Sequence, residues 1–158
     1  MSHQAIIVLD FGSQYTQLIA RRLRELNVYS EVWPPDTPAA RIAARQPAGV
    51  ILSGGPKSVS DKGAPKCDPA LFAVGTPVLG ICYGMQLMAD TLGGRVAPAP
   101  QREFGHAMVT ITGNGESAAL FADVPPEIRV WASHGDFVAS APAGFSIVAT
   151  SANAPGDR

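Results

Sequence analysis

Hydrophobic and polar positions follow two alternating patterns over the first 94 residues. Short segments that are mostly apolar predict strands, and apolar residues at helical spacing, clearest in the segment after Ser13, predict helices. The expected strands are 5–9, 28–33, 49–52 and 77–81, and the expected helices are 13–26, 39–45, 68–74 and 85–92. This alternation is typical of an α/β fold with a doubly wound, mostly parallel sheet.

Polar and small residues predict where these helices begin and end. Ser13 is expected to cap the first helix, and Asp36 or Thr37 the second, because side-chain oxygens at these positions accept free backbone N–H groups. Gly93-Gly94 is expected to end the fourth helix.

The pattern changes in the C-terminal third of the chain. Segments 104–112, 128–132 and 145–150 are typical of strands separated by Gly, Pro and Asn turns, and residues 152–158 suggest an exposed loop. We therefore expect an antiparallel β extension after the parallel sheet. The length of 158 residues suits one domain with a proper core, so residues 1–158 are taken as a single domain.

The segment from Val78 to Gln86 contains the clearest chemistry. Cys82 stands between Gly80 and Gly84, after an apolar strand and before a helix-prone segment. The G-x-C-x-G spacing is a form of the nucleophile elbow, a sharp strand-to-helix turn that exposes one side chain. The positive end of the following helix is expected to favour the thiolate. We predict that Cys82 is a nucleophile, and the alternative is a buried, inert cysteine.

A glycine turn, Ser53-Gly54-Gly55-Pro56, follows the third expected strand. Ligands of open parallel sheets bind at the carboxyl ends of the strands, so the turn lies beside Cys82 if the third and fourth strands are neighbours. Its N–H groups would then join that of Tyr83 in stabilising an oxyanion. The alternative is a tight turn that needs glycine for its backbone angles. A Walker phosphate loop is excluded, because Pro56 lacks an N–H and no Gly-Lys-Ser/Thr follows.

A cysteine nucleophile normally needs a histidine base, and the chain contains His3, His106 and His134. His134 is the best candidate, in a polar segment, residues 131–136, expected to follow a strand. A structural or substrate-contacting role for His134 is at least as plausible. The two cysteines form no metal-type cluster, so no metal is expected.

Composition excludes several classes of function. Hydrophobic residues make up 46% and charged residues 16% of the chain, as in globular proteins. The net charge of −1 argues against nucleic acid as the main partner. No apolar run reaches membrane-spanning length, and the N-terminus lacks a signal-peptide pattern. We expect a cytoplasmic protein with a free thiol.

Four segments together resemble the class I glutamine amidotransferase family over essentially the whole chain. Residues 78–86 resemble the nucleophile motif of that family, and residues 53–56 resemble its oxyanion loop. Residues 8–22 and 133–136 are similar to the forms found in the branch that aminates a purine nucleotide.

The resemblance implies roles for individual residues. Cys82 would attack the side-chain amide carbon of glutamine to form a thioester and release ammonia, and water would then release glutamate. The backbone N–H groups of Gly55 and Tyr83 would hold the oxyanion. Four residues would line the glutamine site: Gln86, Ser133, Gly135 and Asp136.

The resemblance also implies a partner domain. Full-length members of this branch pass ammonia to a synthetase domain of the same polypeptide, which uses ATP and Mg²⁺, and the full-length protein is expected to be a homodimer. The amidotransferase domain itself is expected to need no cofactor. The catalytic histidine and glutamate of the family lie in an F-H-P-E type motif beyond residues 133–136, and residues 1–158 contain no such motif. We therefore expect a domain that is incomplete at its C-terminus and nearly inactive alone.

Three other functions remain open at this point. The chain resembles, less closely, the amidotransferase subunits of anthranilate and carbamoyl phosphate synthesis, although residues 10–22 argue against them. A non-catalytic binding or regulatory module would keep the fold without the reaction. A cysteine redox sensor would show thiol oxidation without reactivity toward glutamine.

Overall fold

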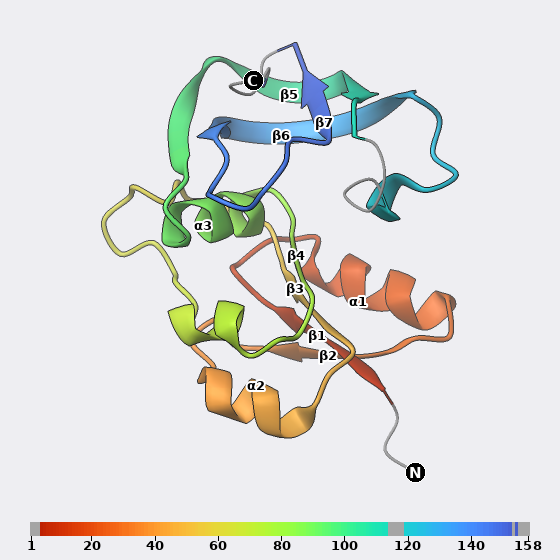
Figure 1. The fold of residues 1–158 in the computed structure, drawn as a ribbon, viewed down its shortest axis with the longest axis vertical. Helices are drawn as coiled ribbons and strands as arrows, with labels where there is room; N and C mark the ends of the chain where they lie inside the picture. Colours follow the sequence, from red (N-terminus) through yellow and green to blue (C-terminus); the bar gives the residue numbers. More distant parts are fainter. Residues whose placement is uncertain (1–3, 114–118, 153, 155–158) are drawn as a thin grey trace. The chain divides into compact units, whose positions relative to one another are not determined.

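The computed structural model describes residues 4–113, 119–152 and 154. The chain divides into two compact units, Met1–Met88 and Ala89–Arg158 (Figure 1). The assignment of residues 1–158 to one amidotransferase domain stays a prediction.

The first unit is built on a four-stranded sheet in the order β2-β1-β3-β4. Its strands are β1 (Ala5–Leu9), β2 (Tyr29–Trp33), β3 (Gly49–Leu52) and β4 (Val78–Gly80). Every neighbouring pair in this sheet is parallel, which confirms the predicted sheet. The central strands β1 and β3 are almost completely buried, as expected for parallel strands that are covered on both faces.

Four helices belong to or begin in the first unit: α1 (Thr16–Glu25), α2 (Ala39–Arg45), the 3₁₀ helix η1 (Pro69–Ala73) and α3 (Tyr83–Thr91). Figure 1 shows α1 and α2 on opposite sides of the sheet. The strand order explains this arrangement, because the connections from β1 to β2 and from β2 to β3 run in opposite directions along the sheet and right-handed crossovers are strongly preferred. Buried Ala20 of α1 and Ile42 of α2 face the core.

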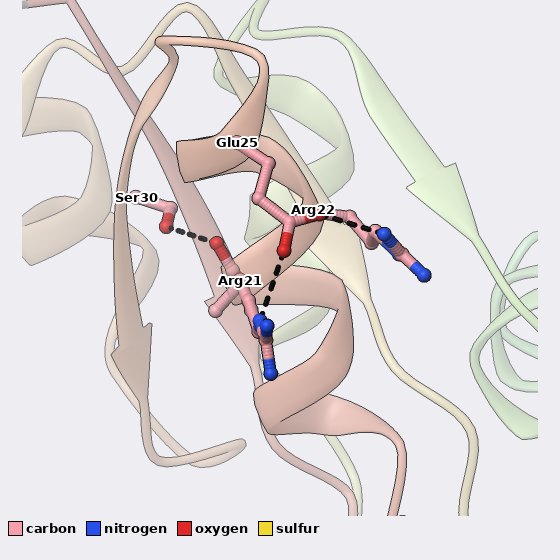
Figure 2. Close-up of polar contacts among 5 residues, drawn as sticks. Arg21, Arg22, Glu25 and Ser30 are labelled. Carbon is pink, nitrogen blue, oxygen red and sulfur yellow. Dashed lines mark hydrogen bonds and ion pairs between the residues drawn. The ribbon is translucent and has the colours of Figure 1, made fainter.

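A buried hydroxyl attaches α1 to β2. Ser30, which is 2% exposed, donates from its Oγ to the carbonyl oxygen of Ala20 at 3.0 Å (Figure 2). On the outer side of the helix, Glu25 pairs with Arg21 at 2.9 Å and with Arg22 at 2.7 Å. These exposed ion pairs stabilise the fold little, so the buried bond and the apolar packing hold the helix in place.

The predicted cap of α1 is wrong. The helix begins at Thr16, with Tyr15 in the N-cap position and no side-chain cap. Ser13 Oγ instead accepts the N–H of Tyr15 at 3.0 Å within the turn that precedes the helix. The hydroxyl therefore shapes the loop after β1 and not the helix end.

The predicted cap of α2 is also wrong, because the cap comes from a distant residue. Pro38 occupies the N-cap position, and the N–H of Ala39 donates to Asp68 Oδ2 at 2.9 Å. Asp68 Oδ1 also accepts the N–H of Ala70 in η1 at 3.0 Å. These two hydrogen bonds lower the pKa of Asp68, and the bond from Ala39 has the larger effect. One carboxylate thus holds the starts of two helices together.

The turn between β4 and α3 packs closely against β3. The N–H of Ile81 donates to the carbonyl of Leu52 at 3.0 Å. A Cβ added at Gly84 would lie 2.6 Å from the carbonyl carbon of Leu52, and one added at Gly80 would lie 2.5 Å from the Cα of Met85. Because no side chain fits at these distances, the two glycines let α3 begin directly against the sheet.

The second unit is a three-stranded antiparallel sheet in the order β6-β5-β7. Its strands are β5 (Arg95–Ile111), β6 (Glu127–Ser140) and β7 (Ala149–Ser151). The predicted antiparallel extension is confirmed, but β5 and β6 are longer than the expected 104–112 and 128–132, and β7 is shorter than 145–150. The register shifts between Pro98 and Glu103, and this irregularity accommodates the prolines that hide the strand pattern in the sequence.

Replacing Gly84 with alanine is expected to lower the free energy of unfolding by about 1–3 kcal/mol or more, because the new methyl overlaps the backbone of Leu52. Gly54→Ala is the matched control, since its added Cβ would meet its nearest neighbours at 3.6 Å, an ordinary contact distance. Urea denaturation of both variants measures the difference. Equal loss of stability in the two variants would contradict this account of the turn.

Asp68→Asn is expected to destabilise the chain at neutral pH and to lose that effect in acid. The pKa of Asp68 is lowered in the folded chain, so its carboxylate contributes fully above the ordinary aspartate pKa of about 3.9. That contribution disappears as the pH falls through the folded-state pKa. The midpoint temperatures of thermal unfolding, measured for the parent chain and for Asp68→Asn from neutral to acid pH, test this expectation. A difference in midpoint temperature that stays constant with pH would mean that the charge of Asp68 does not hold α2 and η1 together.

Candidate active site

Cys82 lies in the sharp turn between β4 and α3. Its φ is 49°, a left-handed value that is uncommon for a residue with a side chain and that marks strained elbow turns. Its carbonyl accepts the N–H of Gln86 at 3.1 Å, so Cys82 immediately precedes the first turn of α3. The residue is exposed, whereas Cys67 is buried. The predicted elbow is present, and its catalytic role stays a prediction.

The expected lowering of the Cys82 pKa is wrong. Partial burial raises the pKa of the Cys82 thiol above its usual range. The residue is exposed as a whole, but its surroundings withdraw enough water from the sulfur to disfavour the charged form. Burial also raises the pKa of Cys67, and the charge of Asp68 adds to the effect. To react at neutral pH, Cys82 therefore needs a proton acceptor beside it.

The glycine turn lies beside Cys82, as predicted. Leu52 at the end of β3 pairs with Gly80 at the end of β4, so the turn and the elbow leave the sheet at the same edge. A Cβ added at Gly54 would lie 3.6 Å from the Cβ of Cys82 and 3.6 Å from the Oγ of Ser13. The loop after β1 therefore reaches the same place, and three carboxyl-terminal strand ends converge there.

Gly55 is closely packed, and its backbone N–H lacks an acceptor among the described residues. A Cβ added there would lie 2.7 Å from the carbonyl oxygen of Phe11 and 3.4 Å from the Cγ of Tyr83. Within the described part of the chain, no group accepts the backbone N–H of Gly55. An oxyanion hole requires such a preorganised donor close to the nucleophile. Gly55 and Tyr83, the two expected oxyanion residues, are thus neighbours, and their function stays a prediction.

Tyr83 anchors the base of the elbow. The residue is 1% exposed, and its hydroxyl donates to the carbonyl of Pro65 at 2.5 Å. The centroid of its ring lies 5.5 Å from that of Phe11. The side chain therefore joins two loops to the start of α3 and fixes the peptide that follows Cys82, a role that its expected backbone function did not suggest.

Ser53 was expected only as part of the glycine turn, and sequence reasoning gave its side chain no role. It is completely buried, and its Oγ accepts the N–H of Phe11 at 3.0 Å and donates to the carbonyl of Gly54 at 3.0 Å. Its position in the sequence, a polar residue between a buried strand and two glycines, could have indicated a hydrogen-bonding role. A hydroxyl at such a place is expected to be hydrogen-bonded, because an unpaired buried one is costly.

The expected glutamine-binding residues fall in both units. Gln86 lies in α3 and is 4% exposed. Ser133, Gly135 and Asp136 lie within β6, where Ser133 pairs with Phe104. Segment 131–136 is therefore part of a strand and not a polar segment after one. The binding role of these four residues stays a prediction.

None of the three histidines is established as a base. His106 makes an edge-to-face contact with Trp131, with 5.2 Å between ring centroids, and both residues are exposed on the antiparallel sheet. The backbone of His134 lies in β6 opposite Glu103, while its side chain lies outside the described part of the structure. His3 also lies outside the described residues.

Neither a metal cluster nor a membrane span is found in the described parts of the chain. Residues 4–113, 119–152 and 154 contain no group of three His, Cys, Asp or Glu side chains that could hold a metal ion. The helices among them are too short or too polar to cross a bilayer.

The sequence matches one protein family over nearly its whole length. A profile of the family described as glutamine amidotransferase class-I matches residues 7–155. The chain is 53% identical over 155 residues to the glutamine-hydrolyzing GMP synthase of Syntrophomonas wolfei and 56% identical over 155 residues to that of Lactiplantibacillus plantarum. Each match covers 98% of this chain but only 30% of the relative, so the chain spans about a third of the length of these relatives.

One solved structure supports the family, and a second, less similar in sequence, shows the same fold. A GMP synthase component from Thermoplasma acidophilum superposes with a TM-score of 0.83 at 30% identity, covering 98% of this chain and 76% of that one. A glutamine amidotransferase from Thermotoga maritima superposes with a TM-score of 0.74 at 21% identity, covering 99% and 70%. The match of the family profile and the likeness to the Thermoplasma protein together show that this chain belongs to the class I glutamine amidotransferase family.

Proposed function

We propose that this chain is the glutamine-hydrolysing part of a GMP synthase and releases ammonia for the amination of xanthosine monophosphate to GMP. The observation that carries the proposal is the exposed Cys82 in its elbow beside the Gly54–Gly55 turn. The backbone N–H of Gly55 in that turn has no acceptor among the described residues. Identities above 50% to two GMP synthases support the choice of this branch over anthranilate or carbamoyl phosphate synthesis.

The reaction begins at the side-chain amide of glutamine. The sulfur of Cys82 bonds to the amide carbon, and the π electrons of the carbonyl move to its oxygen, where the N–H groups of Gly55 and Tyr83 stabilise the oxyanion. The carbonyl re-forms as the amide nitrogen takes up a proton and leaves as ammonia. Water then adds to the thioester, and glutamate departs with regeneration of the thiol.

The thiol must lose its proton before it attacks, and its raised pKa disfavours this at neutral pH. In this proposal the base is the histidine of an F-H-P-E type motif, oriented by the glutamate of the same motif, in a longer polypeptide. His134 is the alternative base within the chain. Loss of triad members costs about 10⁴-fold or more in rate in other enzymes, so residues 1–158 alone are proposed to be nearly inactive.

We propose that four residues bind the α-amino and α-carboxylate end of glutamine: Gln86, Ser133, Gly135 and Asp136. Asp136 is the only acidic one among them and suits the α-ammonium group, because opposite charges attract most strongly where water is excluded. Gln86 and Ser133 carry donors that suit the α-carboxylate, and Gly135 leaves room for the ligand beside its backbone.

The proposed partner is a synthetase domain of the same polypeptide. That domain would require ATP and Mg²⁺, whereas this part would need no cofactor. The greater length of the GMP synthase relatives supports such a domain. We further propose a homodimer for the full-length protein and a cytoplasmic location, with glutamine and not nucleic acid or a membrane as the ligand of this part.

Alkylation of Cys82 by iodoacetamide is expected to accelerate with pH and to reach half of its maximal rate at a higher pH than an ordinary cysteine does, because burial raises its pKa. Deprotonation produces the reactive thiolate, so the rate follows its population. Peptide mass mapping distinguishes Cys82 from buried Cys67, which is expected to react more slowly. A rate that is already maximal at neutral pH would contradict the raised pKa.

A chloromethyl ketone analogue of glutamine is expected to label Cys82 with saturation kinetics, because it binds before it reacts. Glutamine should slow this labelling, while glutamate and asparagine at the same concentration should protect less. The stoichiometry of labelling, followed by intact mass, measures the effect. Labelling that rises linearly with reagent and is unaffected by glutamine would contradict the proposed function.

A separate experiment tests the choice of the GMP synthase branch. In any longer polypeptide that contains this segment and a synthetase domain, xanthosine monophosphate with ATP and Mg²⁺ is expected to stimulate glutamate release, and chorismate is not. Stimulation by chorismate alone would favour the anthranilate branch.

A further inference from the structure

We propose that the buried hydroxyl of Ser53 positions the oxyanion donor of the site, the backbone N–H of Gly55. The inference rests on the glutaminase function proposed above, and it assigns a task in that reaction to a residue outside the expected set of site residues. Ser53 would not touch glutamine itself and acts through the peptide that follows it.

One backbone and two side-chain hydrogen bonds hold Ser53 in place. Its own N–H donates to the carbonyl of Leu9 at 3.1 Å, which ties its backbone to the end of β1. Its Oγ accepts the N–H of Phe11 at 3.0 Å and donates to the carbonyl of Gly54 at 3.0 Å. A hydroxyl has one proton to donate, and here that proton is committed to Gly54.

The bond to Gly54 determines where the N–H of Gly55 points. The described residues contain no cis peptide bond, and in a planar trans peptide the carbonyl and the next N–H point in opposite directions. Holding the carbonyl of Gly54 on Ser53 therefore aims the N–H of Gly55 to the other side. A peptide between two glycines has more rotational freedom than any other, so its orientation needs an external tie.

The peptide that Ser53 holds is the one in contact with the elbow. A Cβ at Gly54 would lie 3.6 Å from the Cβ of Cys82, and a Cβ at Gly55 would lie 3.4 Å from the ring of Tyr83. The N–H of Gly55 has no acceptor in the described part of the chain. A donor that is fixed, unpaired and next to the nucleophile is preorganised for an oxyanion that appears only during the reaction.

Ser53 also has a structural role, because its bond to Phe11 joins the loops after β1 and β3. Ser30 offers a matched control for that role. It is likewise buried, and its Oγ donates to the carbonyl of Ala20 at 3.0 Å (Figure 2). It lies in β2, which is separated from β3 by β1, and it has no contact with the glycine turn among the bonds described.

Two alkylation rates at Cys82 separate positioning from general stability. When the thiolate adds to the carbonyl carbon of the glutamine-analogue chloromethyl ketone, the ketone oxygen becomes an oxyanion. The sulfur then displaces chloride from the adjacent carbon, its bond to the carbonyl carbon breaks, and the oxyanion electrons re-form the ketone. Iodoacetamide reacts by direct displacement of iodide and forms no oxyanion. The ratio of the two rates, measured on the 158-residue chain, cancels differences in thiolate population.

Ser53→Ala is expected to lower this ratio by about 10-fold or more, since loss of one oxyanion donor costs about 10²- to 10³-fold in other enzymes and a misdirected donor is partly lost. The iodoacetamide rate should stay within about twofold of the parent. Protection by glutamine should be unchanged, because the oxyanion is absent from the bound substrate. Ser53→Thr keeps the hydroxyl and should restore the ratio, and Ser30→Ala should leave it unchanged.

Several outcomes overturn the inference. One is a parental ratio in a folded Ser53→Ala chain, and another is an equal fall in Ser30→Ala, which would indicate general loosening. If Ser53→Ala does not fold, as circular dichroism would show, Ser53→Cys replaces it: an intermediate ratio supports the inference and a parental ratio overturns it. Saturable labelling of the parent together with an unchanged ratio overturns the role of Ser53 alone. Unsaturable labelling of the parent overturns the proposed function, and the inference with it.

Discussion

The parallel pairing of β3 with β4 is the contact on which the arrangement around Cys82 depends. Leu52 pairs with Gly80 and accepts the N–H of Ile81, so the two strands end at the same level and their loops emerge side by side. Gly84 then lets α3 begin against the backbone of β3. A shift of the pairing by one residue would reverse the faces of all side chains in the strand and carry Cys82 away from the glycine turn. The proposed chemistry is therefore a consequence of strand register.

Side-chain oxygens hold the loops that surround this edge of the sheet. Asp10 Oδ1 accepts the N–H of Gly12 and the hydroxyl of Thr16, both at 2.9 Å. Ser53 and Asp68 act in the same way after β3 and before β4. Each tie fixes backbone that glycine and proline leave outside regular structure, so the strand ends form a rigid frame for a reaction that needs fixed donors.

Local features explain what the sequence predicts well and what it does not. The bounds of β1 and β3 follow from apolar runs that end at Asp10 and at Ser53-Gly54, and the glycine spacing around Cys82 identifies the elbow. The cap of α2 comes from Asp68, 29 residues beyond Ala39, and no local pattern reports such a partner. The raised pKa of Cys82 results from burial by tertiary neighbours, whereas sequence reasoning considers only the helix that follows. The role of Ser53 likewise requires knowing that β1 and β3 are adjacent.

The bond from Tyr83 to Pro65 also has a practical consequence for residues 57–66. It pins one end of this loop, and the tip is internally braced, since Ser58 N–H bonds to Asp61 at 2.8 Å and Lys57 Nζ bonds to the Gly63 carbonyl at 3.2 Å. The intervening positions 60–63 are exposed. A fluorophore or affinity handle attached to these exposed residues would therefore sit on a bend that is hydrogen-bonded within itself.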